Sequence, residues 1–193
     1  MSHNPLAVIF TPIMAVWALI LIWRSKKWWS IKALIISGFW ALSLAAFFTL
    51  PVLVEGKLVH LETLFIGYFN YLAHFVDINQ LFISDFWGFG GSIWGTGDGM
   101  SYQIGYLHTG ATFSSLLISL YLWKKDKTKS LCILFMVAIF WFASFLMHSK
   151  SNFIWEKIKI LQNLQFPWRI LSVVIFVSSF VAGSVFVLKT RES

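Results

Sequence analysis

Acidic and imidazole side chains gather between residues 55 and 108 and again just after residue 147. This group holds five of the eight carboxylates and four of the five histidines: Glu55, Glu62, Asp77, Asp85, Asp98, His60, His74, His108 and His148. Carboxylates and imidazoles are the groups that bind metal ions and transfer protons. We therefore expect any chemistry of this chain in these segments.

His74 and Asp77 are three residues apart in the sequence. Residues three apart share one face of a helix, so this spacing predicts either a shared metal site or a proton relay. The alternative is a helix that turns its polar side toward water and lipid headgroups. No third ligand follows at a fixed spacing, so both interpretations stay open.

Asp98 lies between Gly97 and Gly99, in a stretch from 85 to 108 that holds seven of the 12 glycines. Glycine lets the backbone approach a ligand closely, and a carboxylate there could coordinate a divalent cation that binds phosphate. The alternative is a plain Asp-Gly turn. Asp85, at the start of the stretch, is a further candidate catalytic carboxylate or a helix cap.

Three residues are candidates for contact with a substrate lipid. Arg169 follows Trp168 and could hold a lipid phosphate by two parallel hydrogen bonds, or could simply extend its guanidinium to the headgroups. His108 lies just inside a predicted membrane span, where ionisable groups are costly and often functional. Its place near the start of that span also allows it to reach the interface.

The composition is that of a membrane protein. Hydrophobic residues make up 58% of the chain and charged residues only 12%, against about 25% in soluble domains. The net charge is +7, but the basic residues cluster between apolar runs, which indicates membrane orientation and not a nucleic-acid surface. The single cysteine, Cys132, rules out a disulfide within the chain.

Hydropathy predicts an all-α, multi-span integral membrane protein with one membrane domain and five transmembrane helices. These spans are expected at about 5–23, 31–53, 105–123, 131–147 and 170–188, with outer loops at 54–104 and 148–169.

One or two amphipathic helices are expected along the outer interface. Residues 58–76 are apolar, but they contain Glu62, and a central acid costs about 2.5–3.5 kcal/mol on insertion. We therefore favour an interfacial or re-entrant helix there, with a sixth span as the alternative. Residues 151–165 form the second candidate, because apolar residues from Ile154 to Leu164 recur at helical spacing.

The distribution of lysine and arginine predicts the orientation. Ten of the 15 fall in segments that the five-span arrangement puts on one side: Arg24, Lys26, Lys27, Lys32, Lys124, Lys125, Lys127, Lys129, Lys189 and Arg191. The positive-inside rule places that side in the cytoplasm. The amino terminus is then outside and the carboxyl terminus inside, in the inner or plasma membrane.

Three motifs carry a resemblance to a known family. They are F-F-T-L-P-V-L-V-E at 47–55, W-G-F-G-G-S-I-W-G-T-G-D-G-M-S-Y-Q-I-G-Y-L-H at 87–108 and L-Q-F-P-W-R-I-L at 164–171. They resemble a group of uncharacterised bacterial and archaeal polytopic proteins whose label relates them to pyruvoyl-tetrahydropterin synthase. Those proteins are similar in layout to membrane glycosyltransferases of the C fold class, which use polyprenyl-phosphate-linked sugars.

The resemblance implies part of a sugar transferase that acts on the outer face with a polyprenyl-phosphate lipid and a divalent cation. In that fold class the catalytic acids lie in an early external loop. This chain has no such loop before residue 54, so the resemblance implies a carboxyl-terminal portion that needs an upstream membrane half or a protein partner and is inactive alone. The rivals are a non-enzymatic scaffold or lipid-binding subunit and, last, a transporter or flippase component.

Overall fold

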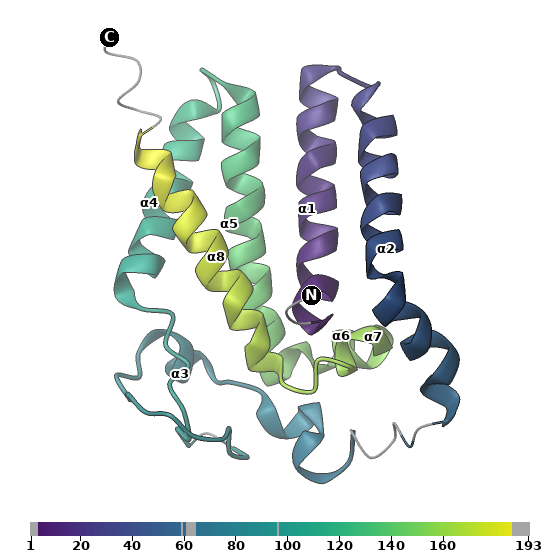
Figure 1. Cartoon of the computed structure of the whole chain (residues 1–193). Helices are drawn as coiled ribbons and strands as arrows, with labels where there is room; N and C mark the ends of the chain where they lie inside the picture. The colour runs from purple at the N-terminus through teal and green to yellow at the C-terminus, as the bar shows by residue number, and fades with distance from the viewer. Residues whose placement is uncertain (1–3, 59, 61–64, 96, 187–193) are drawn as a thin grey trace. The chain divides into compact units, whose positions relative to one another are not determined.

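The computed structural model describes residues 4–58, 60, 65–95 and 97–186 (Figure 1), and every regular element among them is helical. The chain divides into two compact units, residues 1–66 and 67–193. Glu62, Lys189, Arg191 and the last two residues of the predicted fifth span lie outside the described residues.

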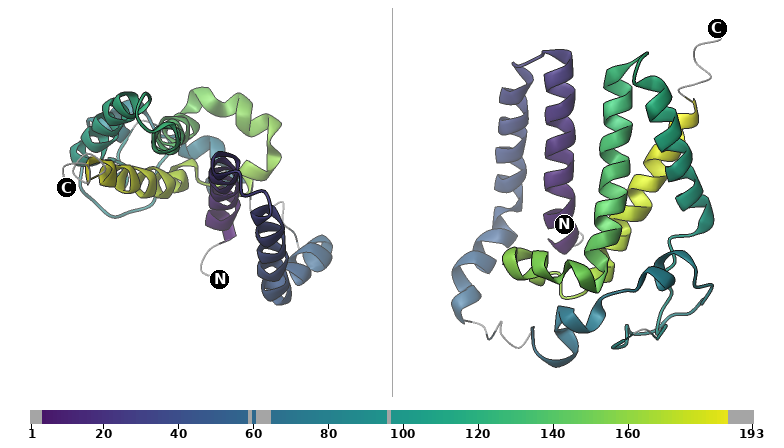
Figure 2. Two further views of the ribbon diagram at one scale, coloured as in Figure 1. Left: turned by 90° about the horizontal axis from the view of Figure 1, so that it is seen from above. Right: turned by 180° about the vertical axis from the view of Figure 1, so that it is seen from behind.

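The first unit is a helical hairpin. Helix α1 (Asn4–Ser25) runs into α2 (Ser30–Glu55), and a 3₁₀ turn, η1 (Gly56–Leu58), follows. Figure 2 shows the two helices side by side in both views. The turn uses Lys26 at a φ of 56°. No residue of α2 is buried, although the helix is apolar on every side. A helix that is apolar all round and uncovered by protein is suited to lipid.

The second unit is built on a three-helix bundle. Helices α4 (Tyr106–Leu122), α5 (Lys127–Met147) and α8 (Leu171–Ala182) pack against one another, with η6 (Pro167–Ile170) and η7 (Gly183–Val185) flanking α8. The residues at its centre are almost fully buried: Met136, Val137, Phe140, Val173, Val174 and Val177.

Serine hydroxyls cross between these helices. Ser115 of α4 donates to the carbonyl of Val181 in α8 at 2.7 Å, and Ser184 donates to the Ser115 hydroxyl at 3.0 Å. Ser130 of α5 donates to the carbonyl of Ser119 in α4 at 2.7 Å. Small polar residues are common at such contacts in membranes, because they allow close approach and bridge helices.

Among the described residues, four helical segments are long and apolar enough to cross a membrane: Leu6–Ser25, Ser30–Glu55, Lys127–Met147 and Pro167–Val185. The prediction of an all-helical, multi-span membrane protein is confirmed at that level. The expected span at 105–123 corresponds to α4, which has only 17 residues. At about 1.5 Å per residue it is shorter than a bilayer core of about 30 Å, so a fifth crossing stays a prediction.

The connections hold short helices instead of long interfacial ones. Before α4 come η3 (Gly67–Phe69), η4 (Tyr71–His74) and α3 (Ile78–Phe82). The described residues of 58–76 therefore form separate 3₁₀ turns and neither a span nor a continuous amphipathic helix. After α5 come η5 (Ser149–Ser151), α6 (Asn152–Lys157) and α7 (Lys159–Gln162). The expected helix over 151–165 breaks at Ile158, at φ −105° and ψ 76°.

Trp155 packs the segments before α3 and after α5 against the end of the bundle. Its ring is fully buried, and its Nε1 donates to the carbonyl of Leu146 at 3.0 Å. The ring of Tyr71 stacks on it with centroids 5.4 Å apart, and Phe75 meets its edge at 5.8 Å. The backbone N–H of Val76 then donates to the carbonyl of Met147 at 2.8 Å. The segment before α3 is thus held at the end of α5.

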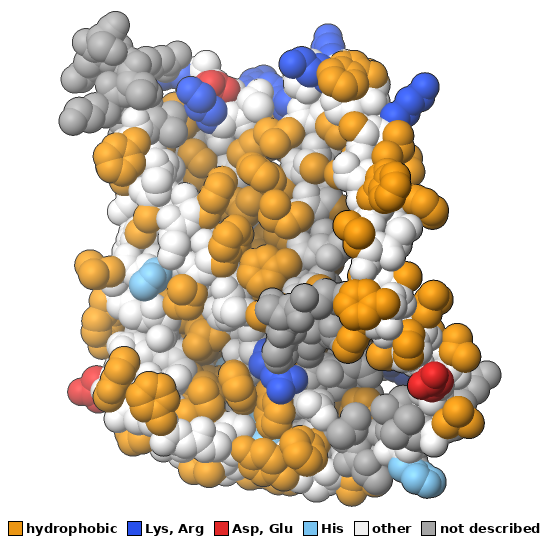
Figure 3. Space-filling model, viewed as in Figure 1, with side chains coloured by type: hydrophobic (Ala, Val, Ile, Leu, Met, Phe, Trp, Pro, Cys, Tyr) orange, Lys and Arg blue, Asp and Glu red, His pale blue; other side chains and the backbone are white. Residues whose placement is uncertain are grey.

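Basic side chains gather at the opposite end of α5, where α4 turns into it (Figure 3). The lysines there are Lys124, Lys125, Lys127 and Lys129. Along the bundle helices between this turn and the loops the visible surface is mostly apolar. The second unit thus has four lysines at this turn, while Lys150, Lys157, Lys159 and Arg169 lie at the loop-bearing end.

Candidate functional site

The glycine-rich stretch before α4 folds back on the segment that contains α3, and Asp98 is its first anchor. Asp98 Oδ1 accepts a hydrogen bond from Gln80 Nε2 at 2.9 Å, and its Oδ2 accepts one from Ser84 Oγ at 2.8 Å. Gln80 Nε2 also donates to the carbonyl of Gly97 at 3.1 Å. Both oxygens of the carboxylate are therefore engaged by side chains of the protein itself.

His74 is the second anchor. Its ring is 2% exposed, its Nδ1 lies 2.6 Å from Ser92 Oγ, and its Nε2 contacts the carbonyl of Tyr68. A carbonyl only accepts, so Nε2 carries the proton and Nδ1 accepts from the serine hydroxyl. The rings of Tyr68 and Phe166 pack edge-on to the imidazole, with centroids at 4.9 and 4.6 Å. His74 thus acts as a buried tie between the loop and the segment beneath it.

Tyr102 joins the same hydrogen-bond network through Ser92. The hydroxyl is hydrogen-bonded to Ser92, and burial raises the pKa of Tyr102 to about 12, although the hydrogen bond opposes the rise. Backbone bonds close the loop nearby, from Ser101 N–H to the carbonyl of Gly88 at 3.2 Å and from Ile104 N–H to that of Leu81 at 2.9 Å. The phenol therefore stays neutral over the physiological pH range.

The glycines let the two sides of the loop pack against each other. A Cβ on Gly99 would lie 2.4 Å from the carbonyl oxygen of Gly91, and one on Gly90 would lie 2.5 Å from that of Gly99. A Cβ on Gly91 would meet the Tyr68 hydroxyl at 2.8 Å. The glycines at these three positions are thus required by the packing of backbone on backbone and on one phenol.

The packed loop carries a small aromatic cleft. The volume is about 260 Å³, and the lining residues are Trp87, Gly88, Phe89, Gly90, Met100 and Ser101. The rings of Trp87 and Phe89 meet nearly perpendicularly, with centroids 6.2 Å apart, and are 82% and 96% exposed. This cleft, which we call the loop cleft, combines exposed rings with peptide groups and one hydroxyl.

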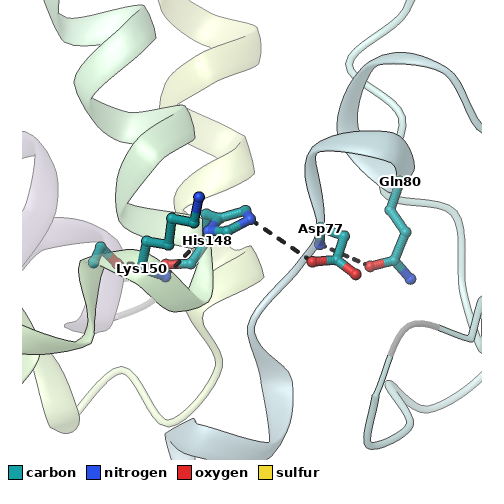
Figure 4. A network of polar contacts seen from close by, with 5 residues as sticks. Asp77, Gln80, His148 and Lys150 are labelled. Carbon is teal, nitrogen blue, oxygen red and sulfur yellow. Dashed lines mark hydrogen bonds and ion pairs between the residues drawn. The ribbon is translucent and has the colours of Figure 1, made fainter.

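Asp77 and His148 form a second pair, at the end of α5 (Figure 4). Asp77 precedes α3 as its N-cap residue, and its backbone N–H donates to Gln80 Oε1 at 2.9 Å. His148 Nδ1 accepts from the backbone N–H of Lys150 at 3.1 Å, so Nε2 carries the proton and faces Asp77 Oδ1 at 3.7 Å. In this tautomer the imidazole is neutral and turns its N–H toward the Asp77 carboxylate.

The expected helix face shared by His74 and Asp77 does not form. The backbone is extended at Phe75 and again at Asp77, with ψ of 147° and 156°. His74 consequently bonds Ser92 and Tyr68, while Asp77 faces His148. The two side chains join different networks, because the segment is fixed by tertiary contacts and not by a continuous helix.

Arg169 and Trp168 surround Phe166. Arg169 Nη1 donates to the carbonyl of Leu164 at 2.8 Å, and its guanidinium lies 4.7 Å from the centre of the Phe166 ring. The Trp168 ring lies 5.5 Å from the same ring, and among the described residues its Nε1 has no hydrogen-bond partner. Arg169 therefore braces the turn into α8, a role that the sequence did not indicate.

The other two candidates lie apart from these networks. His108 is half-buried in the first turn of α4, with Nδ1 beside Gly105, and Asp85 is exposed. Within the described ranges, no group of three histidine, cysteine, aspartate or glutamate side chains is arranged to hold a metal ion. The residues proposed for a divalent cation, Asp98, His74 and Asp77, therefore do not fit a shared site, and no metal-dependent step follows from them.

Sequence reasoning missed the uncharged partners Gln80, Ser84 and Ser92. Gln80 had a usable signal, because an aspartate followed three residues later by glutamine is typical of a helix start. Ser84 and Ser92 had none, since their partners lie 14 and 18 residues away. Comparison of the chain with protein-family models, with curated proteins and with solved structures finds no match.

Proposed function

We propose that this chain is part of a membrane glycosyltransferase that uses a polyprenyl-phosphate-linked sugar donor on the outer face of the cell membrane. Its own contribution is to bind the donor. The observation that carries this proposal is the loop cleft, held rigid by the ties through Asp98 and His74.

The loop cleft has the chemistry that a sugar ring needs. A pyranose offers C–H faces that pack on aromatic rings and hydroxyls that hydrogen-bond to peptide groups. The rings of Trp87 and Phe89 supply the first, and the glycine backbone and Ser101 supply the second. Its volume of about 260 Å³ is below the roughly 300–1,000 Å³ of most ligand pockets, which favours one small polar group.

The glycosyl-transfer step itself is not assigned to the described residues. Both carboxylate oxygens of Asp98 accept hydrogen bonds from Gln80 and Ser84, and Asp77 faces His148. In this proposal the catalytic acid and any cation come from a partner or from membrane segments outside the described residues.

A second candidate is a lipid-binding subunit without catalytic chemistry. The engagement of both Asp98 carboxylate oxygens by Gln80 and Ser84 favours it. Both candidates place the chain in the membrane with its loops on one side, and both predict binding of the donor. They differ in whether sugar transfer depends on the chain.

Binding is tested with the full chain in lipid nanodiscs and a polyprenyl-phosphate glucose that carries a photoreactive group on the sugar. Crosslinks are expected in the peptide that contains Trp87 and Phe89. They should fall at least about tenfold in the double variant Trp87→Ala/Phe89→Ala and stay unchanged in Trp29→Ala, an exposed tryptophan of the first unit. Crosslinking spread evenly over the chain would contradict the proposal.

Transfer is tested in membranes of the source cell with the gene intact, deleted or restored. Loss of sugar transfer on deletion, regained with the wild type but not with Trp87→Ala/Phe89→Ala, supports the transferase. Crosslinking at the loop cleft with transfer unaffected by deletion supports the lipid-binding subunit instead.

A further inference from the structure

A larger pocket lies between α3 and the adjoining ends of α4 and α5. Its volume is about 620 Å³. The walls come from three elements of the second unit: Ile78, Leu81 and Phe82 of α3, Thr109 and Phe113 of α4, and Trp141, Ser144 and Phe145 of α5. We call it the helix-end pocket. Its size is within the range of pockets that bind a ligand.

The walls are apolar and aromatic. Trp141 is the central side chain, with Phe82 stacked on it at 5.9 Å and Phe113 edge-on at 5.5 Å. The Ser144 hydroxyl does not offer its proton to the pocket, because it donates to the carbonyl of Phe140 at 2.8 Å. The Thr109 hydroxyl likewise donates to the carbonyl of Gly105 at 3.1 Å. A hydrocarbon chain suits such a lining.

The mouth of the pocket carries the positive charge of the Lys150 ammonium. Lys150 and His148 line it, and both belong to the turn that follows the last residue of α5 (Figure 4). Within the described ranges, no carboxylate is within ion-pair distance of the Lys150 ammonium. The nearby carboxylate of Asp77 faces His148 Nε2 instead. An ammonium at the rim of an apolar pocket suits a phosphate group.

The pocket therefore has the polarity of a membrane lipid. Its apolar walls lie within the first eight residues of α4 and the last seven residues of α5. Its cationic rim lies just beyond the helix end. We propose that the helix-end pocket holds one hydrocarbon tail of a lipid whose phosphate pairs with Lys150. That this lipid is the sugar donor rests on the proposed function; the lipid site itself does not.

The test is native mass spectrometry of the full chain released from nanodiscs, with phosphatidylglycerol, diacylglycerol of the same chains, polyprenyl phosphate and free glycerol phosphate as probes. Phosphatidylglycerol or polyprenyl phosphate should stay bound, and free glycerol phosphate should not compete. Lys150→Ala should weaken phosphate-lipid binding by about tenfold, the loss expected for one charge-assisted hydrogen bond. Lys157→Ala, an exposed lysine of α6 outside the pocket, is the matched control.

A variant that fills the pocket distinguishes the contribution of the hydrocarbon tail to binding from that of the phosphate. Ser144→Leu should reduce binding of phosphatidylglycerol and diacylglycerol alike, whereas Lys150→Ala should spare diacylglycerol. A thermal melt in detergent checks that each variant is folded. Because Lys150 is exposed, we expect Lys150→Ala to fold like the wild type. Equal binding by wild type and Lys150→Ala, an equal loss in Lys157→Ala, or competition by free glycerol phosphate would overturn the proposal.

The two proposals fail separately. Retention of phosphatidylglycerol that depends on Lys150, together with no crosslinking at the loop cleft, upholds the lipid site and contradicts the donor role. Crosslinking at the loop cleft with no effect of Lys150→Ala does the reverse.

Discussion

Asp98 is of a residue type that often binds metal ions, yet here its carboxylate holds a loop in place. Its flanking glycines suggested a group free to approach phosphate or metal, yet both carboxylate oxygens accept from Gln80 and Ser84. Ser92 and His74 make the corresponding tie on the other side of the loop. The rigid part of the site is therefore made by neutral side chains, and the exposed rings are left to contact a ligand.

Replacing Asp98 by alanine should destabilise the second unit. The change leaves Gln80 Nε2 with only the Gly97 carbonyl and Ser84 without an acceptor, which costs about 1–3 kcal/mol. Equilibrium unfolding in detergent micelles measures the free energy. Asp85→Ala, an exposed carboxylate on the same loop, should change it by less than about 0.5 kcal/mol. Equal effects of the two variants would show that the Asp98 contacts are not made.

Alkaline pH should loosen the loop through Tyr102. The pKa of this phenol is raised to about 12 in the folded state, against about 10 in an unfolded chain. Its contribution to stability is therefore fully present below about pH 10 and is lost as the pH rises toward 12. The midpoint of phenolate absorbance and the free energy of unfolding measure this. Tyr102→Phe should lack that part of the decline; an unchanged decline would assign it to other groups.

At the scale of elements, the long apolar runs were predictable and the short connections were not. Hydropathy placed α1, α2 and α5 to within a few residues, because twenty apolar residues in a row leave few alternatives. The segment 151–165 has helical periodicity but breaks at Ile158. Its position is decided by Trp155 at the end of α5, a contact that periodicity does not reveal.

The candidate site was predictable in location but not in geometry. The acids and histidines indicated the loop before α4, where the ties through Asp98 and His74 indeed lie. The contacts themselves join residues 14 to 18 positions apart, and the backbone between them is irregular. No helical or strand period relates such residues, so sequence alone could not pair His74 with Ser92.

Trp155→Ala should detach the connection after α5. It removes a fully buried ring, the stacking with Tyr71 and the hydrogen bond to Leu146, at a cost of about 3–5 kcal/mol. Phe153→Ala, on the same short helix but 54% exposed, should cost less than about 0.5 kcal/mol. Thermal melts in detergent compare them. Similar melting temperatures for both variants would refute the anchoring role of Trp155.

Gly99→Ala should distort the loop, whereas Gly110→Ala should not. The new Cβ at 99 would lie 2.4 Å from the Gly91 carbonyl oxygen, while at 110, on α4, nothing lies within 4 Å. We expect a loss of about 1–3 kcal/mol for the first change, and little or a small gain for the second. Limited proteolysis of the 85–105 loop and unfolding in detergent measure both effects. Faster cleavage in Gly110→Ala than in Gly99→Ala would contradict the close packing.

At the scale of the whole molecule, the second unit carries its loops at one end of the α4–α5 pair and the basic turn at the other. Within the second unit, the loop cleft precedes α4, and the helix-end pocket lies between α3, the start of α4 and the end of α5. The basic turn joins the other ends of α4 and α5. The first unit adds a hairpin whose second helix buries no residue against protein and so needs lipid around it. We propose that α4 crosses the membrane, with the loops outside and the basic turn in the cytoplasm.

The most direct measurement of this claim is sided cysteine labelling of the full chain in intact cells. With Cys132 replaced by alanine, single cysteines are placed at Asp85, on the loop, and at Lys124, in the basic turn, both exposed. The account predicts that a membrane-impermeant maleimide reacts with Asp85→Cys in intact cells and with Lys124→Cys only after the membrane is opened. Labelling of both positions in intact cells, or of Lys124→Cys alone, would contradict it.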